Sequence, residues 1–502
     1  MPVFIAIGAA IAAAHHYTKK LGSKKDDAPA IDPSLLKGLI PIDLLPSEER
    51  FVREHPIRTI SFYEGNASDA ASILWGRLNE IVRKNSWLCG CLVKGGKEGD
   101  IYADRPSIRI WYEESRSTMH PGMFQFYPRG LVHITSTTPY AELESVLDGF
   151  DVSVKPNCDI LNNKQESLFR VSVIPEHHPC DDSSSGGFAL VVSMSSVLGD
   201  DYTFFKLYDM LVGSDIVSLD PRRVEQFDIA MKNLMGDIEA EYVAHITADP
   251  CWEKIFIHDE LETSSQLEGR LFEVSSSWIN DTKLSKVQRE RKIAHNSLFS
   301  CSFQSPVDDL NVTDEEGKVV KELSISDIIV SWFWNVIQPT VGLLEVNLRG
   351  HVKVAGANHA GNYVNSIAYT QDDYKTVERI HKSLSTFCRA GKNLDPPTIL
   401  PRVRVNTRFS IVSNHLHFSQ QKSIDNELSD KIKTLHSNKF TLVRHLPLYF
   451  ASALQGVLPK RMSFLHLFQI SQEKIGCFVV APADSISKIN ECGIVDELIF
   501  GF

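Results

Sequence analysis

Two successive sets of strand and helix patterns most strongly constrain how this chain folds. One set occupies residues 35–215 and the other residues 323–502, while residues 216–322 between them carry few strand signals. A chain of 502 residues is also longer than one hydrophobic core usually supports. We therefore predict an α+β protein of two lobes, each a mixed sheet covered by helices, with a crossover region between them. Residues 1–34 are predicted to be an apolar leader and a linker.

Hydrophobic periodicity predicts the individual elements of each lobe. The apolar run at residues 188–194 predicts a buried strand, and a helix is predicted directly after it. The polar, serine-rich residues 259–309 are predicted to cross between the lobes. Strands are predicted at residues 58–63, 92–93, 108–111, 131–134, 168–174, 188–194, 343–348, 408–412 and 476–480, and helices at residues 70–82, from about 203, at 222–243 and from about 326.

Charge and cysteine content exclude some classes of protein. The net charge is −11, from 52 basic and 63 acidic side chains. No basic stripe is interleaved with aromatic residues, so the composition disfavours a nucleic-acid partner. The nine cysteines are odd in number and scattered along the chain, which indicates a reducing compartment rather than a disulfide framework. We predict a cytoplasmic monomer.

The apolar, alanine-rich run from Val3 to Ala14 leaves three interpretations open. It is too short to span a bilayer, which takes about 20 apolar residues. It is compatible with a peripheral membrane anchor, with a cleaved signal peptide, or with a flexible leader. The first interpretation would add a membrane contact to an otherwise cytoplasmic protein.

Residues 193–205 form the junction between the buried strand and the next helix, and they read Ser-Met-Ser-Ser-Val-Leu-Gly-Asp-Asp-Tyr-Thr-Phe-Phe. Ser195 and Ser196 fall in the turn, and Asp200 and Asp201 stand where the helix begins. An aspartate at a helix start accepts hydrogen bonds from free backbone N–H groups. Asp200 is therefore predicted to be structural rather than catalytic.

This junction resembles the His-His-x-x-x-Asp-Gly motif of the chloramphenicol acetyltransferase-like superfamily, which includes condensation domains and the BAHD acyltransferases. Aligned on Asp200, the motif places Ser196 at the catalytic histidine, Ser195 at the histidine before it, and Asp201 at the glycine. The Asp-Phe-Gly-Trp-Gly motif of the BAHD enzymes is absent, yet the resemblance spans about residues 38–500. Three further segments support the resemblance. Residues 77–90 look like the early helix and its Asn-Pro-Trp-Leu-x-Gly turn, and Asn347, Arg349 and residues 360–363 look like the Arg-x-Arg and Gly-Asn segment of the second lobe. Asn414 and Phe418 look like an Asn-Trp-x-x-Phe motif in which His415 replaces the tryptophan.

The resemblance implies a fold and a reaction. The fold is a two-lobed sandwich with a tunnel between the lobes, and the reaction moves an acyl group from a thioester to a small hydroxyl or amine acceptor. Acyl-CoA is the implied co-substrate, no cofactor stays bound, and Arg349 is the implied ion-pair partner of Asp200. The implied catalytic positions are Ser196, Asp200 and Asp201, and the implied substrate-binding positions are Ser195, Tyr202, Thr203, Asn347, Arg349, Asn362, Asn414 and His415.

Ser196 departs from the motif at the residue that performs the chemistry. An imidazole has the pKa of a general base at neutral pH, and a serine hydroxyl does not. Three hypotheses follow. Another base serves, among Asp201, His177, His178 and His359; or Ser196 is a nucleophile, although no Gly-x-Ser-x-Gly elbow surrounds it; or the fold is a pseudoenzyme that binds an acyl thioester, a lipid or a protein partner without turnover.

Two other histidine patterns also lead to predictions. Residues 177–182 read His-His-Pro-Cys-Asp-Asp, but structural zinc needs four ligands in paired spacing and no second pair follows. We predict a solvated loop there and no metal site. His415 and His417 lie two residues apart on a predicted strand, so they share one face and are candidates to line the tunnel.

Overall fold

The computed structural model describes residues 36–48, 51–52, 54–95, 107–163, 165–176, 186–246, 267–283, 324–389, 407–416, 435, 440–448, 461–471 and 474–498. The predicted leader and linker, the run from Val3 to Ala14, the histidine pair at 177–178, and most of residues 247–323 lie outside these ranges. Among the described helices, none combines the length and the hydropathy that crossing a bilayer requires.

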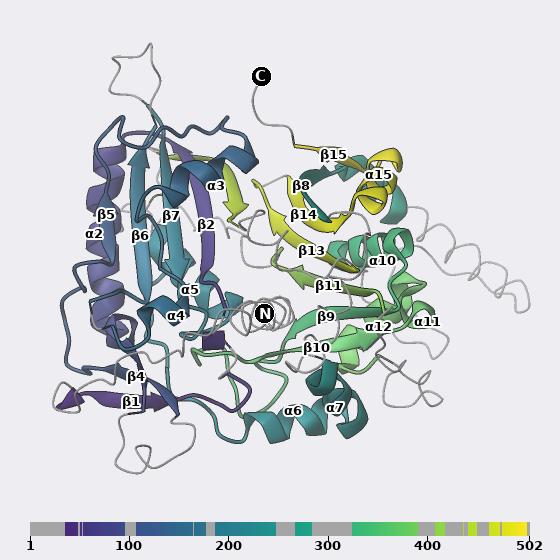
Figure 1. Cartoon of the computed structure of the whole chain (residues 1–502), viewed down its shortest axis with the longest axis horizontal. Helices are drawn as coiled ribbons and strands as arrows, with labels where there is room; N and C mark the ends of the chain where they lie inside the picture. Colours follow the sequence, from purple (N-terminus) through teal and green to yellow (C-terminus); the bar gives the residue numbers. More distant parts are fainter. Residues whose placement is uncertain are drawn as a thin grey trace, which may run out of the picture.

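The first lobe is built on a five-stranded sheet with the order β12-β2-β7-β6-β5 (Figure 1). Its pairs are antiparallel except β5–β6. Helices α2 and α5 pack on one face of the sheet, and a small sheet, β1-β4-β3, adjoins the same core. The bounds are β1 (Ile40–Asp43), β2 (Ile57–Glu64), α2 (Ala67–Lys84), η3 (Ser86–Cys89), β3 (Cys91–Lys94), β4 (Ile108–Tyr112), β5 (Phe124–Phe126), α3 (Tyr140–Asp148), α4 (Asn157–Ile160), β6 (Phe169–Pro175), β7 (Phe188–Met194), α5 (Asp201–Val212) and β12 (Thr441–Pro447).

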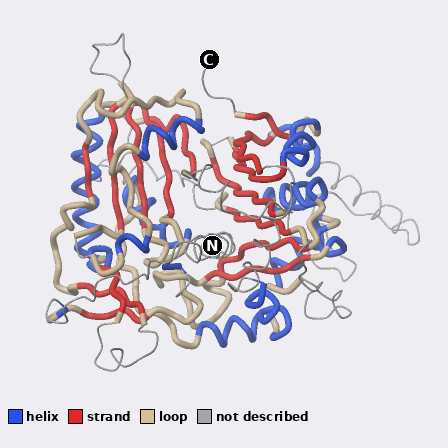
Figure 2. Tube along the Cα trace, in the orientation of Figure 1, coloured by secondary structure: helices blue, strands red, loops and turns tan. Residues whose placement is uncertain are grey.

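The second lobe is built on a seven-stranded sheet with the order β10-β9-β11-β13-β14-β8-β15. β9, β11 and β13 run parallel, and the other pairs are antiparallel. Helices α10, α12 and α15 lie on the outer side of the sheet, whereas α6 and α7 lie beside its β10 edge (Figures 1 and 2). The bounds are α6 (Phe227–Met235), α7 (Asp237–Ile246), β8 (Leu267–Val274), α10 (Ile325–Ile337), β9 (Val341–Asn347), β10 (Val364–Tyr369), α11 (Gln371–Tyr374), α12 (Val377–Thr386), β11 (Phe409–Asn414), β13 (Met462–Gln469), β14 (Ile475–Pro482), α15 (Ala483–Glu491) and β15 (Val495–Glu497).

The central strands are buried on both faces because the lobes share a core. In β7, Val191 faces this shared core, whereas the next residue, Val192, faces the core under α2 and α5. In β9, Leu343 faces the shared core and Leu344 faces the core under α10. Side chains alternate between the faces of a strand, so each such strand is apolar at nearly every position. This arrangement explains the continuous apolar run seen in the sequence at residues 188–194.

Two predicted elements differ from the structure. Residues 131–134 do not form a strand: the chain turns there, with Leu131 N donating to Pro128 O at 3.2 Å, and Val132 and Ile134 fill the shared core from irregular backbone. Residues 222–243 do not form one helix. Gly236, at φ +90°, separates α6 from α7, because this backbone conformation ends a helix.

Two strands lie in unexpected places. β8 falls inside the predicted crossover, yet it pairs with β14 and β15 in the sheet of the second lobe. Its Leu271 and Phe272 face opposite cores, with polar residues between the apolar ones. β12 comes late in the chain but pairs with β2 in the first lobe. Strand pairing over such separations depends on tertiary packing, which local periodicity does not report.

Gly342 provides a test of how tightly helix α10 packs on β9. A Cβ added at this glycine would lie 2.8 Å from the buried ring of Trp334, whose Nε1 donates to Ser410 Oγ at 3.0 Å. We expect Gly342→Ala to lower the free energy of unfolding by about 1–3 kcal/mol, because the ring has to move. Exposed Gly76 in α2 is the control, since a Cβ there meets nothing within 4 Å; Gly76→Ala should raise that free energy by about 0.5–1 kcal/mol. An unchanged thermal midpoint for Gly342→Ala would contradict the packing described.

Candidate functional site

Asp200 organises the junction between β7 and α5. It is the N-cap of α5, and its Oδ1 accepts hydrogen bonds from the backbone N of Thr203 at 3.0 Å and from Thr203 Oγ1 at 3.1 Å. Its Oδ2 accepts from the backbone N of Tyr363, in the second lobe, at 3.0 Å. Asp200 therefore caps α5 and also contacts the second lobe.

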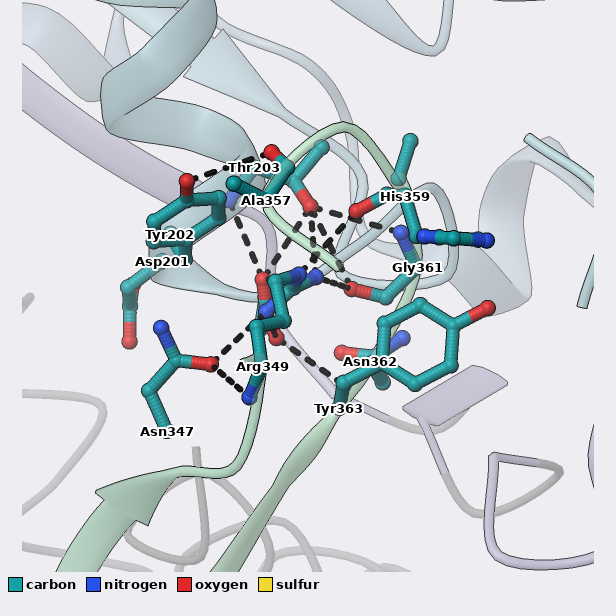
Figure 3. Close-up of polar contacts among 12 residues, drawn as sticks. Asp201, Tyr202, Thr203, Asn347, Arg349, Ala357, His359, Gly361, Asn362 and Tyr363 are labelled. Carbon is teal, nitrogen blue, oxygen red and sulfur yellow. Dashed lines mark hydrogen bonds and ion pairs between the residues drawn. The ribbon is translucent and has the colours of Figure 1, made fainter. Parts of the chain in front are cut away.

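Arg349 forms the predicted ion pair with Asp200, and Figure 3 shows its further contacts with Asn347 and Gly361. Its Nη1 lies 2.6 Å from Asp200 Oδ2 and its Nη2 lies 3.0 Å from Oδ1, with side-chain exposures of 2% and 0%. Nη2 also donates to Gly361 O at 2.7 Å, and the guanidinium lies over the ring of Tyr202, 4.6 Å from its centroid. Two-point geometry of this kind makes an ion pair strong and directional. The pair ties the start of α5 to the segment after β9.

The two motif asparagines of the second lobe support this junction. Asn347 Oδ1 accepts from the backbone N and from Nη1 of Arg349, both at 3.1 Å. Asn362 Nδ2 donates to Glu48 Oε1 at 3.0 Å and to Ser196 O at 3.1 Å. Glu48, which the sequence did not single out, also pairs with Arg223 at 2.9 Å. These contacts orient backbone and charged groups within the junction.

Ser195 and Ser196 are buried in a hydrogen-bonded network with Asn157. Ser195 Oγ donates to Asn157 Oδ1 at 2.6 Å, and Asn157 Nδ2 donates to Ser196 Oγ at 2.8 Å. Ser196 Oγ in turn donates to the carbonyl of Phe51 at 3.2 Å. Thus the position of the motif histidine holds a hydroxyl that both donates and accepts within the core. Asn157 follows Pro156 and begins the short helix α4, and no sequence signal marks it.

Asp201 and His415 form a second polar contact beside the first. Asp201 Oδ2 lies 3.0 Å from His415 Nε2, and both side chains are 5% exposed. Burial raises the pKa of Asp201, whereas the charge and the hydrogen bond of His415 lower it, and the net shift takes that pKa below its ordinary value. Asp201 also begins α5, where the helix dipole favours a carboxylate. The pair therefore joins an ionised carboxylate to an imidazole across the lobe junction.

A small cavity opens beside this pair. Its volume is about 10 Å³, which suits about one water molecule. The cavity lies between the lobes, since β2 and α5 line it from the first lobe and β13 lines it from the second. Its polar lining consists of Arg58, Thr59, Asp201, His415, His445 and His466.

Two of the cavity histidines were not predicted. His445 of β12 hydrogen-bonds through Nδ1 to Ser61 Oγ at 2.8 Å, and burial, helped by the charge of His415, lowers the pKa of His445 to about 4. Burial also holds the pKa of His466 well below its ordinary value, and its ring lies edge-on to that of His415, with centroids 4.3 Å apart. Both imidazoles are neutral at pH 7. His466 lies between Leu465 and Leu467, whereas His445 lies between Arg444 and Leu446, so no common pattern in the sequence marks the two histidines.

The remaining predicted residues lie around the junction or outside the described ranges. Asn414 ends β11 and its Oδ1 accepts from Leu416 N at 3.1 Å, while Tyr202 OH donates to Ala357 O at 3.2 Å. His359 Nδ1 accepts from Gly356 N at 3.0 Å in the loop before Gly361. Two of the suggested alternative bases, His359 and Asp201, are among the described residues, and of these two Asp201 lines the cavity. His177, His178 and His417 are not among the described residues. The six described cysteines are free thiols.

Comparisons with known proteins bear on the fold. No protein-family model matches this sequence, and no curated protein matches it. The structure of F. graminearum TRI101 with coenzyme A and deoxynivalenol resembles this one with a TM-score of 0.51 at 10% identity, over 91% of this chain and 99% of that chain. Polyketide synthase associated protein 5 from Mycobacterium tuberculosis gives 0.50 at 10% identity, over 91% and 97%. The chain therefore has the chloramphenicol acetyltransferase-like fold that its motif segments predict.

Breaking the buried ion pair tests its role. Arg349→Met leaves Asp200 as a buried charge without its counterion, so we expect the free energy of unfolding to fall by about 3–5 kcal/mol. Replacing both partners, in Asp200→Asn/Arg349→Met, should cost less than the sum of the two single changes. Arg270→Met removes an exposed pair with Glu268 and should cost at most about 1 kcal/mol. Strict additivity in denaturant unfolding would contradict direct coupling between Asp200 and Arg349.

The pKa of His445 predicts a pH dependence of stability. Because the folded pKa of about 4 lies below the ordinary value of about 6.5, the unfolded chain binds a proton that the folded chain does not. Stability should therefore fall as the pH drops from about 6.5 towards 4, by on the order of 3 kcal/mol from this group. His445→Asn keeps a polar partner for Ser61 and should flatten the thermal midpoint against pH. His245→Asn, on the exposed side of α7, should behave as the parent does; identical curves for all three proteins would exclude His445 as the cause.

Proposed function

We propose that this chain transfers an acyl group from a thioester, acyl-CoA, to a hydroxyl or amine of a small molecule, with His415 as the general base. The observation that carries the proposal is the 3.0 Å contact between Asp201 and His415 at the cavity between the lobes. These residues stand where the motifs have glycine and tryptophan, so two separate departures from the family pattern meet in space. The same chain has lost both motif histidines, at Ser195 and Ser196.

The Asp201–His415 pair has the chemistry that a base requires. When His415 Nε2–H donates to Asp201, the tautomer is set and Nδ1 carries the lone pair. The acceptor gives its proton to Nδ1 as its oxygen or nitrogen attacks the thioester carbonyl; the C–S bond then breaks, and the thiolate of CoA leaves and takes up the proton. The ionised carboxylate stabilises the imidazolium that forms between these steps.

The choice of acyl-CoA as donor draws on the fold. The similar TRI101 structure contains coenzyme A. The cavity polar groups, His445 and His466, are neutral at pH 7, so they orient an acceptor by hydrogen bonds without competing for its proton. Ser196 is not part of this scheme, because its hydroxyl is engaged by Asn157 and Phe51.

A second candidate function is binding without turnover. The Ser195–Asn157–Ser196 network fills the place of the motif base with a satisfied polar core, and the cavity has a volume of only about 10 Å³. Both features suit a protein that keeps the fold as a binding frame for an acyl thioester or a partner.

Release of CoA from acetyl-CoA, with a panel of alcohols and amines as acceptors, separates these functions. We expect His415→Asn to lower kcat by about 10²–10⁴-fold and Ser196→Ala to change it by less than about threefold. Asp201→Asn should also lower kcat, since the carboxylate no longer stabilises the imidazolium.

The opposite pattern, loss of turnover in Ser196→Ala with retention in His415→Asn, would contradict the proposed base. If the parent binds acetyl-CoA in calorimetry but releases no CoA with any acceptor, the second candidate function is supported instead.

A further inference from the structure

Glu345 of β9 brings another carboxylate to the Asp201–His415 pair. One ligand atom from each of Asp201, Glu345 and His415 lies within 4.8 Å of the other two. Asp201 comes from the start of α5 in the first lobe, Glu345 from β9, and His415 from the residue after β11. Three metal-ligating side chains from separate elements thus converge at the lobe junction. The sequence did not indicate this, because Glu345 lies 70 residues before His415 in the chain.

The spacing of the polar atoms is close to that around a bound ion. Ser413 Oγ donates to Glu345 Oε2 at 2.9 Å and lies 3.0 Å from His415 Nε2, which is 3.0 Å from Asp201 Oδ2. Two ligands held about 2.0–2.2 Å from Zn²⁺ in tetrahedral geometry lie about 3.3–3.6 Å apart. Glu345 is half-buried, and binding an ion requires its carboxylate to take the place of the serine hydroxyl beside His415.

We infer that Asp201, Glu345 and His415 form a binding site for a divalent transition-metal ion, with Zn²⁺ as the ion that the ligand set fits. Two carboxylates balance the charge of a divalent ion, and an imidazole favours Zn²⁺ over Mg²⁺ or Ca²⁺, which prefer oxygen ligands alone. The ring of His466 lies edge-on to that of His415, with centroids 4.3 Å apart, so a further imidazole adjoins the site.

The site provides a switch for the base. An ion on Nε2 of His415 leaves the ring proton on Nδ1, and Nδ1 then has no lone pair for an acceptor proton. Bound Zn²⁺ is therefore expected to stop CoA release. This consequence rests on the proposed function, whereas the binding itself does not.

Metal titration of the full chain tests the site directly. Co²⁺ is the probe, followed by its visible d–d absorption, and Zn²⁺ displaces it. We expect Glu345→Gln to remove one equivalent or to weaken its binding by about 100-fold or more, since even supporting residues of metal sites contribute 10–100-fold. Glu142→Gln, on exposed α3, makes the same charge change and should bind as the parent does. Equal stoichiometry and affinity in Glu345→Gln and the parent would overturn the proposal.

A second measurement uses the unaltered chain, so it does not depend on a variant folding. X-ray absorption of the protein with one equivalent of Zn²⁺ should show nitrogen and oxygen ligands that include imidazole; sulfur ligands would assign the ion to cysteines and overturn the site. Zn²⁺ binding without any CoA release by the metal-free parent would support the site and contradict the proposed function. If the protein releases CoA, binds no Zn²⁺, and is unaffected by added Zn²⁺, the proposed function is supported and the metal site is contradicted.

Discussion

The buried ion pair between Asp200 and Arg349 is the interaction on which the rest of the site depends. Both groups are almost fully removed from water, so each charge needs the other and each remaining polar atom needs a hydrogen bond. Thr203, Gly361 and Tyr363 supply those bonds. One carboxylate thereby caps α5 and fixes the first lobe against the second.

The ion pair between Asp200 and Arg349 also fixes the position of Asp201. It is the residue after the cap, so holding Asp200 against Arg349 also places the next carboxylate at the opposite side of the helix start, toward His415. The shared core of the two sheets and the contact of Glu48 with Arg223 and Asn362 prevent the lobes from sliding apart. The proposed base, which is assembled from both lobes, requires a junction that holds its groups in place and away from water.

The residues at the two ends of the degenerate motif, the serines and Asp201, make different contacts in the structure. The serines at the histidine positions join a neutral network with Asn157, which needs no charge and no solvent access. The aspartate at the glycine position instead gains an imidazole partner from β11. Burying a carboxylate without a partner would cost free energy, so the contact between Asp201 and His415 stabilises both buried side chains. The proposed base and the proposed metal site both depend on that pairing, and only the metal site also requires Glu345.

The sequence by itself determined the local features and the fold. Apolar periodicity predicted the helices α2, α5 and α10 and the strands β2, β3, β4, β6, β7, β9, β11 and β14. The resemblance of the residues around Asp200 and Arg349 to a known motif implied both the fold and their ion pair, because a motif keeps its hydrogen-bonding partners when the rest of a chain diverges. Only the tertiary structure decided that β12 joins the first lobe, that β8 lies within the predicted crossover, that His445 and His466 line one cavity with His415, and that Glu345 lies near that histidine. Those contacts join residues far apart in the chain, where burial and pairing are set by how two sheets pack and not by any local pattern. For the same reason the sequence predicted Ser196 at an open tunnel, whereas in the structure Asn157, at the start of α4, donates a hydrogen bond to Ser196 Oγ.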